Sequence, residues 1–349
     1  MVRCLTSPVR PSKGEQALID WVRRHTPEMR DRVPVGIGDD AAVLRLPGGR
    51  EAPPLLACWR LPRRSHPRPR FPLRTASQGS RRLLFTTDAV LEGTHFPPGA
   101  SYRLVGRKAL AAALSDIAAM GGRALGAVVA VSFPKKVGMR AARELHRGVL
   151  EVSAKYDVPL VGGNVASWQG PLAVTVSVVG VPAGRRPVLR SGARVGDTVL
   201  VTGELGGSLL GRHFRFEPRL PEGEWLGRWG RVHALIDLSD GLATDLGHIL
   251  QESRCGAVVE AVKVPVSAAA RRLSRKTGRP PLEHALTDGE DYELCLVVPQ
   301  AAVAGLLRRW PFATCLTVIG RILKRGYWLQ QPDGKRERLT LGGYEHTLS

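Results

Sequence analysis

Segments with the character of β-strands alternate with helix-like segments along most of this chain, and the alternation starts again after a break. Before the break, we expect strands at 83–91, 125–134, 158–164 and 171–182 and helices at 14–24, 105–122 and 141–156. After it, we expect strands at 197–203, 234–241, 293–298 and 316–322 and a helix at 242–254. Strands and helices that alternate in both halves predict an α/β (α+β) fold with two domains.

The break between the two halves lies at 183–197, where glycine and arginine are frequent. We therefore expect an N-terminal domain over 1–188 and a C-terminal domain over 189–349, each of ordinary size. Within the first domain, 49–82 is rich in proline, arginine and serine and shows no sustained period. This composition predicts an exposed, mobile insertion.

The chain carries 51 Lys and Arg against 31 Asp and Glu, a formal net charge of +20. Such a balance is typical of nucleic-acid-binding proteins, and that class is kept as one alternative. However, nine arginines and one glutamate lie between Arg50 and Arg82, so much of the excess belongs to the insertion. Binding through the insertion would weaken steeply with salt and disappear when 50–82 is deleted.

The five cysteines form no CxxC pair, and no apolar run approaches the roughly 20 residues needed to span a bilayer. The first residues also show no apolar signal core. We therefore expect reduced thiols, no membrane partner and a cytoplasmic location.

Acidic residues next to glycine or serine recur where strands are expected to end. They are Asp39, Asp40, Asp88, Asp116, Asp237, Asp240, Asp288, Glu290 and Asp291. Because aspartate is disfavoured inside strands and helices, these residues predict loop ends that converge on one site. Carboxylate oxygens suit hard cations, and Mg²⁺ combines one or two carboxylates with waters and phosphate oxygens. Each motif alone is also compatible with a turn or a helix N-cap.

Glycines accompany these motifs and predict close approach of backbone N–H groups to phosphates. They are Gly36, Gly38, Gly162, Gly163, Gly203, Gly206 and Gly207. The chain has no GxxxxGK[ST] loop and no protein-kinase glycine loop, which argues against both of those kinase folds. His95, in the run LEGTHF, is a candidate ligand contact, although a single histidine is more often structural.

Several longer motifs occur in one order along nearly the whole chain. They are GIGDDAAVL, TTDAVLEGTHF, KALAAALSDIAAMGG, VGGN, VTGELGGS, IDLSDGLATDLGHI, TDGEDYELCLVV, VIGRI and GGYEH. In these motifs the chain resembles the thiamine-monophosphate kinases, which belong to the superfamily of aminoimidazole ribonucleotide synthetase and selenophosphate synthetase. The resemblance implies a homodimer formed through the N-terminal sheets, with ATP and the acceptor in a cleft shared with the second domain.

The same resemblance implies roles for individual residues. The implied Mg²⁺ ligands are Asp40, Thr86, Thr87, Asp88, Asp116, Asn164, Asp237 and Asp240. The implied ATP contacts are Gly163, Asn164, Arg190 and Ser239. The implied contacts to thiamine monophosphate are His95, Glu290 and Tyr344, the last offering an aromatic face to a cationic heterocycle.

The implied reaction is phosphoryl transfer from ATP to thiamine monophosphate, the last step of thiamine diphosphate biosynthesis, assisted by several Mg²⁺ ions. Because the attacking phosphate oxygen is already anionic at neutral pH, no residue is required as a general base. Three features depart from the family pattern: Asn164 stands where many members have aspartate, Asp288 stands where glycine is usual, and the insertion at 49–82 is unusually long. Another ATP-dependent member of the superfamily, with a different acceptor, is the nearest alternative.

Overall fold

The computed structural model describes residues 41–45 and 82–339 of the 349-residue chain. The predictions made for the helix at 14–24, the motif ending in Asp40, the body of the insertion and Tyr344 therefore lie outside the described residues. In the described part of the chain, no helix combines the length and hydrophobicity that crossing a membrane requires.

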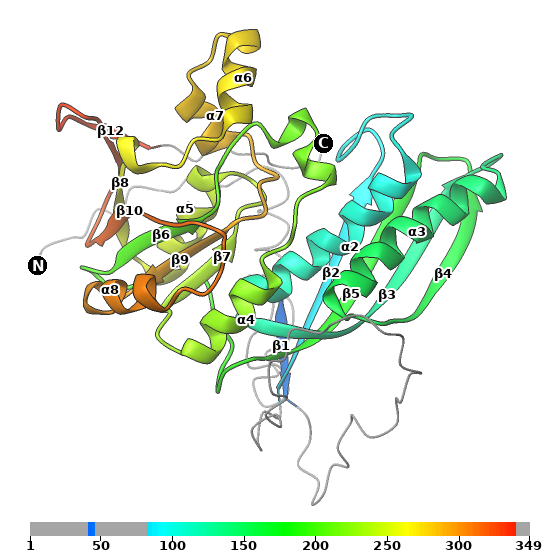
Figure 1. Ribbon diagram of the computed structural model, residues 1–349, viewed down its shortest axis with the longest axis horizontal. Helices are drawn as coiled ribbons and strands as arrows, with labels where there is room; N and C mark the ends of the chain where they lie inside the picture. The colour runs from blue at the N-terminus through cyan, green and yellow to red at the C-terminus, as the bar shows by residue number, and fades with distance from the viewer. Residues whose placement is uncertain (1–40, 46–81, 340–349) are drawn as a thin grey trace, which may run out of the picture.

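The N-terminal half forms a five-stranded sheet in the order β1-β2-β5-β3-β4. Its strands are β1 (Ala42–Arg45), β2 (Arg82–Leu91), β3 (Gly122–Pro134), β4 (Leu160–Trp168) and β5 (Ala173–Pro182). Neighbouring strands are antiparallel except β3 and β4, which are parallel and are connected through α3 (Met139–Tyr156). Helices α2 (Tyr102–Ala119) and α3 lie on one face of this sheet (Figure 1).

The two faces of the N-terminal sheet differ, because successive side chains of a strand point to opposite sides. In β5, Val174, Val176 and Val178 are fully buried on the face that α2 covers. The intervening residues Thr175 and Ser177 are partly exposed on the other face. One face of this sheet is therefore core, and the other is partly open in the part of the chain that the structure describes.

The C-terminal half forms a seven-stranded sheet in the order β12-β11-β8-β10-β6-β9-β7. Its strands are β6 (Thr198–Thr202), β7 (Ala234–Asp237), β8 (Gly256–Glu260), β9 (Leu294–Val298), β10 (Leu316–Leu323), β11 (Tyr327–Gln330) and β12 (Arg336–Arg338). Its helices are α4 (Leu220–Trp229), α5 (Leu242–Ser253), α6 (Ala268–Thr277), α7 (Pro281–Thr287) and α8 (Gln300–Arg309), with short 3₁₀ turns η1 (Ser208–Leu210), η2 (Arg212–Phe214) and η3 (Ala261–Lys263). The predicted mixed α/β class is confirmed, while the domain boundary near residue 188 stays a prediction.

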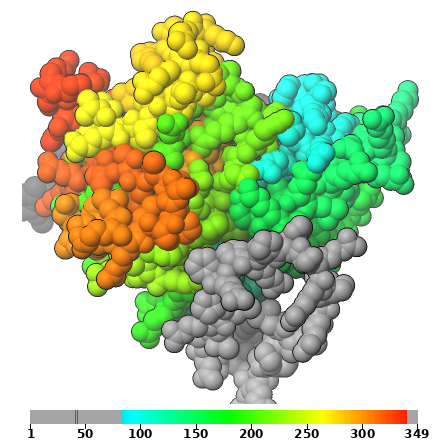
Figure 2. Space-filling model, in the orientation of Figure 1, coloured from blue at the N-terminus to red at the C-terminus, as the bar shows by residue number. Residues whose placement is uncertain are grey.

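Helix α2 joins the two halves (Figure 1). It packs on β2, β3 and β5 of the N-terminal sheet and also contacts α4 and β7 of the C-terminal half. Thirteen of its 18 residues are buried. The helix therefore belongs to the hydrophobic cores of both halves. On the face drawn in Figure 2, atoms of the two halves lie directly against one another.

The strand predicted at 158–164 is longer in the structure, and its glycines form no turn. Strand β4 continues through Gly162 and Gly163 to Trp168, paired in parallel with β3. Gly163 lies opposite Val129, and a Cβ atom at this position would stand 2.1 Å from the Val129 carbonyl oxygen. This glycine therefore permits close packing of two strands rather than a change of chain direction.

Candidate active site at the junction of the two halves

Strand β2 presents polar side chains to α2 in the middle of the N-terminal core. The Thr86 hydroxyl donates a hydrogen bond of 2.5 Å to Oδ2 of Asp116 on α2. Asp88 lies two residues further along the same face of β2. The prediction that the acidic residues mark loop ends is thus wrong for Asp88, which lies inside a strand, and for Asp116, which lies inside a helix. A buried carboxylate is tolerated inside an element when it has a polar partner, as Asp116 has in the Thr86 hydroxyl.

A second hydrogen bond crosses from α2 to the C-terminal sheet. The Ser115 hydroxyl donates to Oδ2 of Asp237, the last residue of β7, at 2.5 Å, and both side chains are buried. The side chains of neighbouring α2 residues thus engage β2 in one half and β7 in the other. This brings Asp116 and Asp237 to the same junction although 121 positions separate them in the sequence.

Tyr292 lies among the carboxylates of this junction. Burial raises the pKa of its hydroxyl, and the negative charges of Glu290, Asp88, Asp237 and Asp116 raise it further, in that order. Charges act more strongly on a buried group than on one in water, because the surrounding dielectric is lower. Four acidic residues from β2, α2, β7 and the loop before β9 therefore act on one buried side chain.

A neighbouring acidic group lies at the start of α5. The side chains of Asp240, Asp245 and His248 offer oxygen and nitrogen atoms within 4.8 Å of one another. Asp245 accepts hydrogen bonds from the backbone N–H groups of Asp240 (3.0 Å) and Gly241 (3.1 Å). Burial raises the pKa of Asp245 and the charges of Asp240 and Asp237 add to it, while the nearby Arg190 opposes them. Arg190 thus lies on the same side of the junction as the predicted ligands of the C-terminal half.

The loop before β9 is attached to the β7–α5 turn. The backbone N–H of Glu290 donates to the carbonyl oxygen of Ser239 at 2.7 Å, and that of Tyr292 donates to Leu238 at 2.8 Å. Gly289, between the same two segments, has φ +72° and would place a Cβ atom 2.6 Å from the Ser239 oxygen. Ser239, Asp240 and Glu290 are therefore held in one local arrangement.

Lys108 is a member of this site that the sequence reading missed. It lies on α2 with its side chain fully buried, and its ammonium forms an ion pair with Glu290 and donates to the carbonyl oxygen of His95 at 2.8 Å. His95 in turn accepts the backbone N–H of Leu91 at Nδ1, at 3.0 Å. The predicted acceptor residues His95 and Glu290, from different halves, thus meet at one buried cation.

Three predicted residues do not join this cluster within one chain. The side chain of Thr87 points to the other face of β2 from Thr86 and Asp88, and the Ser177 hydroxyl donates to it at 3.0 Å. Gly163 and Asn164 lie on β4, and the register Asp88–Val176–Val129–Gly163 runs across four strands. Three strand spacings separate β4 from β2, or about 14 Å. Asn164 therefore cannot share a cation with Asp88 of the same chain.

Three glycines and Asp288 have structural partners instead of the predicted phosphate or acceptor. The N–H of Gly203 donates to the Cys315 carbonyl, and those of Gly206 and Gly207 donate to the carboxylates of Asp291 and Asp288. Asp288 also lies 2.9 Å from Nδ1 of His284. The extra carboxylate at 288 is therefore engaged with α7 and does not add a free acidic group beside Glu290.

The donors at the junction fit a hard divalent cation. They are hydroxyl and carboxylate oxygens gathered in a partly buried space, where burial raises the pKa of Asp88 and the charge of Glu290 adds to it. An uncompensated group of buried carboxylates is unfavourable, and a bound cation would relieve it. Oxygen donors of this kind are those that Mg²⁺ prefers.

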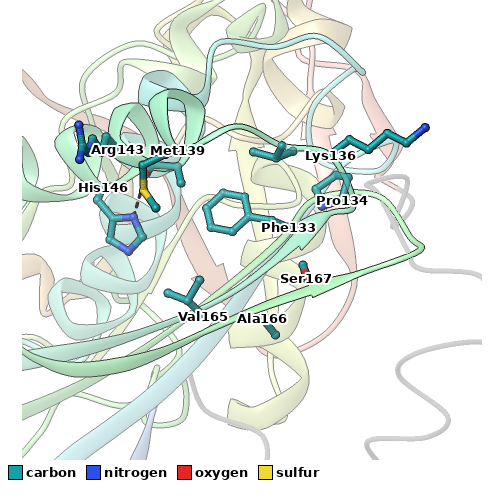
Figure 3. Close-up of a pocket in the computed structure, with 11 residues that line it drawn as sticks. Phe133, Pro134, Lys136, Met139, Arg143, His146, Val165, Ala166 and Ser167 are labelled. Carbon is teal, nitrogen blue, oxygen red and sulfur yellow. Dashed lines mark hydrogen bonds between the residues drawn. The ribbon is translucent and has the colours of Figure 1, made fainter.

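A pocket of about 610 Å³ lies elsewhere, between the start of α3 and the ends of β3 and β4 (Figure 3). Phe133, Met139, His146 and Val165 are among its lining residues, and His146 bonds to the Ala142 carbonyl at 3.0 Å. None of the predicted site residues lines this pocket. The acidic junction is therefore the better candidate for the active site.

Comparison with known proteins places both halves in one family. The N-terminal domain of AIR synthase related proteins matches residues 38–182, and the C-terminal domain of the same family matches residues 194–327. The thiamine-monophosphate kinase of Rhodopirellula baltica is 37% identical over 336 residues, which cover 95% of this chain and 97% of that protein. The thiamine-monophosphate kinase of Escherichia coli K12 is 33% identical over 310 residues, covering 82% of this chain and 83% of that protein.

Solved structures agree with this assignment. AaThiL complexed with AMPPCP and TMP superposes with a TM-score of 0.74 at 27% identity, covering 95% of this chain and 97% of that one. The thiamine-monophosphate kinase of Stenotrophomonas maltophilia K279a gives a TM-score of 0.64 at 31% identity, covering 92% of this chain and 96% of that one. From its two matched domains and its similarity along nearly its whole length, this chain belongs to the thiamine-monophosphate kinases of the AIR synthase related protein family.

Proposed function

We propose that this chain transfers the terminal phosphoryl group of ATP to thiamine monophosphate, giving ADP and thiamine diphosphate. The observation that carries the proposal is that α2 joins acidic residues of both halves: Asp116 accepts from Thr86 of β2, Ser115 donates to Asp237 of β7, and Lys108 is paired with Glu290. The relatives at 37% and 33% identity are thiamine-monophosphate kinases, and AaThiL is complexed with AMPPCP and TMP.

In this reaction an oxygen of the acceptor phosphate forms a bond to the terminal phosphorus of ATP, and the bond from that phosphorus to the bridging oxygen of ADP breaks. The attacking oxygen already carries negative charge, so no proton has to be removed by the protein. The main obstacle is repulsion between two polyanions. It amounts to roughly 4 kcal/mol for each pair of unit charges about 4 Å apart at an effective dielectric near 20.

The residues that would hold Mg²⁺ at this junction are Thr86, Asp88, Asp116, Asp237 and Asp240. When bound, Mg²⁺ supplies positive charge that offsets the repulsion between the phosphates. Arg190 and Ser239 lie beside this group and would bind the nucleotide. Asp40, a further predicted ligand of this half, lies outside the described residues.

His95 and Glu290 would bind the acceptor. Because Nδ1 of His95 accepts the Leu91 N–H, a neutral ring carries its proton on Nε2 and can donate from that side. Glu290, paired with Lys108, would accept a hydrogen bond from a donor group of the acceptor. These two residues place the acceptor at the edge of the acidic junction, next to the nucleotide.

A homodimer is part of the same proposal. Strand β4 lies at an edge of the N-terminal sheet, and its Val161 and Val165 are 66% and 63% exposed. An exposed apolar edge strand is suited to pairing with a second sheet. Pairing of this kind would bring Gly163 and Asn164 of one subunit toward the acidic junction of the other. The cytoplasmic location stays a prediction.

The test is a coupled ADP-release assay with the full-length chain, ATP and Mg²⁺. We expect turnover with thiamine monophosphate, and none with thiamine or with other phosphomonoesters at equal concentration. Preference for another phosphorylated acceptor would replace this function by that of a different superfamily member. ATP hydrolysis that no acceptor stimulates would overturn the kinase assignment.

A further inference from the structure

Lys108 lies in this junction and has no part in the proposed chemistry. Its side chain is 0% exposed in the middle of α2, and an ammonium group is almost never buried unless partners replace its water. Nζ donates to the carbonyl oxygen of His95 at 2.8 Å and to Oε2 of Glu290, and it lies 5.9 Å from the centre of the Phe214 ring. Groups from three separate segments therefore hold this cation.

Two of those three segments carry the predicted acceptor residues. His95 lies in the turn that follows β2, in the N-terminal half. Glu290 lies in the loop between α7 and β9, in the C-terminal half. Lys108 binds the backbone of the first and the side chain of the second, so it fixes their relative position across the junction.

The loop that carries Glu290 is held in an unusual conformation. Glu290 has φ +56° and Tyr292 has φ +51°, values that residues other than glycine keep only when their surroundings impose them. Hydrogen bonds to Leu238 and Ser239 fix the backbone of this loop, but they leave the Glu290 side chain to be placed by other contacts. The ion pair with Lys108 supplies that contact.

The electrostatic environment supports the same role. Burial raises the pKa of Glu290 and lowers that of Lys108, and in each case the charge of the other residue opposes the effect of burial. The charge of Asp88 also favours the ammonium form of Lys108. Each partner therefore helps the other to remain charged in a largely buried site.

We infer that Lys108 is a positioning residue for the acceptor, which holds the Glu290 carboxylate and the His95 segment in the arrangement that binds thiamine monophosphate. The inference rests on the proposed function, because it concerns the same acceptor site. Lys108 has no contact with ATP in this proposal. Its replacement should therefore change the KM for thiamine monophosphate and not the KM for ATP.

The test uses the full-length chain carrying Lys108→Met, with steady-state kinetics in which each substrate is varied in turn. We expect the KM for thiamine monophosphate to rise at least tenfold, equivalent to about 1.4 kcal/mol, with kcat and the KM for ATP within about twofold of wild type. Lys155→Met is the matched control, because Lys155 is also paired with a carboxylate, Glu217 at 2.6 Å, but is 51% exposed on α3. It should leave both KM values unchanged.

A double-substitution cycle separates positioning from general support of the fold. If Lys108 acts through Glu290, Lys108→Met should raise the KM for thiamine monophosphate by less than about twofold in a Glu290→Gln background. The double variant also replaces a buried ion pair by neutral groups, which such sites often tolerate. Should Lys108→Met fail to fold, Lys108→Arg keeps the charge, displaces the donors, and should give the same selective rise in KM.

An equal rise in the KM for ATP, or a tenfold further rise in the Glu290→Gln background, would overturn the inference while leaving the proposed function intact. A wild-type chain without turnover of thiamine monophosphate would overturn both. The two failures are therefore distinguished by the wild-type control in the same assay.

Discussion

Two strands occupy equivalent positions in this molecule, one at an edge of each sheet, yet their surroundings differ completely. In β7, at the edge of the C-terminal sheet, all four residues are buried. In β4, at the edge of the N-terminal sheet, eight of nine residues are exposed. An edge strand is normally protected by a covering element or by a partner strand. The C-terminal edge has such a cover in α2 and α5, whereas β4 stays exposed in the part of the chain that the structure describes.

The difference between the two edges decides which of the predicted site residues one chain brings together. The covered edge delivers Asp237 to the junction, where Ser115 holds it. The open edge carries Gly163 and Asn164, which stand three strands away from Asp88. A single chain therefore assembles the acidic part of the site but leaves the β4 residues for another use, and a second subunit is the use that we propose.

The largest expected effect comes from the covered part of the site. Asp88→Asn should lower turnover by about 10³-fold, because it removes a charge that would help to hold Mg²⁺ while keeping the side-chain shape. In metal-free solution the same variant should be more stable by about 1 kcal/mol, since burial and the charge of Glu290 raise the pKa of Asp88 and so disfavour its ionised form in the folded chain.

The measurements are ADP release with thiamine monophosphate and thermal unfolding with EDTA. Addition of Mg²⁺ and ATP should stabilise the wild type more than Asp88→Asn. Turnover within a few-fold of wild type would show that the acidic junction is not the catalytic centre, whatever the stability data.

The next effect tests the open edge. Val161→Lys introduces a charge on β4 and should weaken subunit association at least tenfold, with a similar fall in activity per chain at low protein concentration. Val262→Lys is the matched control, because Val262 on η3 is 67% exposed and Val161 is 66% exposed. Sedimentation velocity read beside the kinase assay distinguishes the two variants. A fully active wild-type monomer would break the comparison between the two edges.

The last effect is on stability and not on activity, and it concerns Asp291 in the C-terminal half. Burial raises the pKa of Asp291 from 3.8 to about 7, against the opposing hydrogen bonds from Ser208 and Gly206. The folded chain therefore binds more protons than the unfolded chain between these values. Stability from this group is complete below pH 3.8 and is lost as the pH rises through about 7. The loss is at most about 4 kcal/mol.

Chemical denaturation of metal-free protein gives the free energy of unfolding at pH 5 and at pH 8. The difference between these two free energies should be smaller for Asp291→Asn than for wild type. Asp333→Asn, at an exposed turn, is the control and should keep the wild-type difference. If Asp291→Asn leaves the pH dependence of the unfolding free energy unchanged, Asp291 stays ionised in the folded chain between pH 5 and pH 8.

The alternation of strands and helices was enough to predict the fold class, because each segment carries its own periodicity. The C-terminal residues of the candidate site could also be predicted from the sequence. Asp237 ends an apolar strand, Asp240 follows that strand, and Glu290 precedes another. The apolar and polar pattern of neighbouring residues determines these positions, and a single sequence contains that pattern.

Other members of the site depend on contacts that no local pattern contains. Asp116 and Lys108 lie within a helix in which thirteen of 18 residues are buried, so their polarity marks distant partners and not an exposed face. The left-handed backbone of Glu290 and Tyr292 is imposed by the β7–α5 turn and could not be predicted from residue type. The glycines at 206 and 207 look suited to phosphate, yet carboxylates of the same chain occupy their amides.

The burial of α2 in both halves has a consequence for how reactants come and go. A hinge motion that parted the halves would uncover the part of α2 that contacts α4 and β7 and break the contacts of Ser115 and Lys108 together. Such an opening is costly, so we expect nucleotide and acceptor exchange to rely on smaller displacements of surface segments. The rate of product release should then follow the mobility of those segments, and the catalytic frame itself should remain the same through the whole cycle.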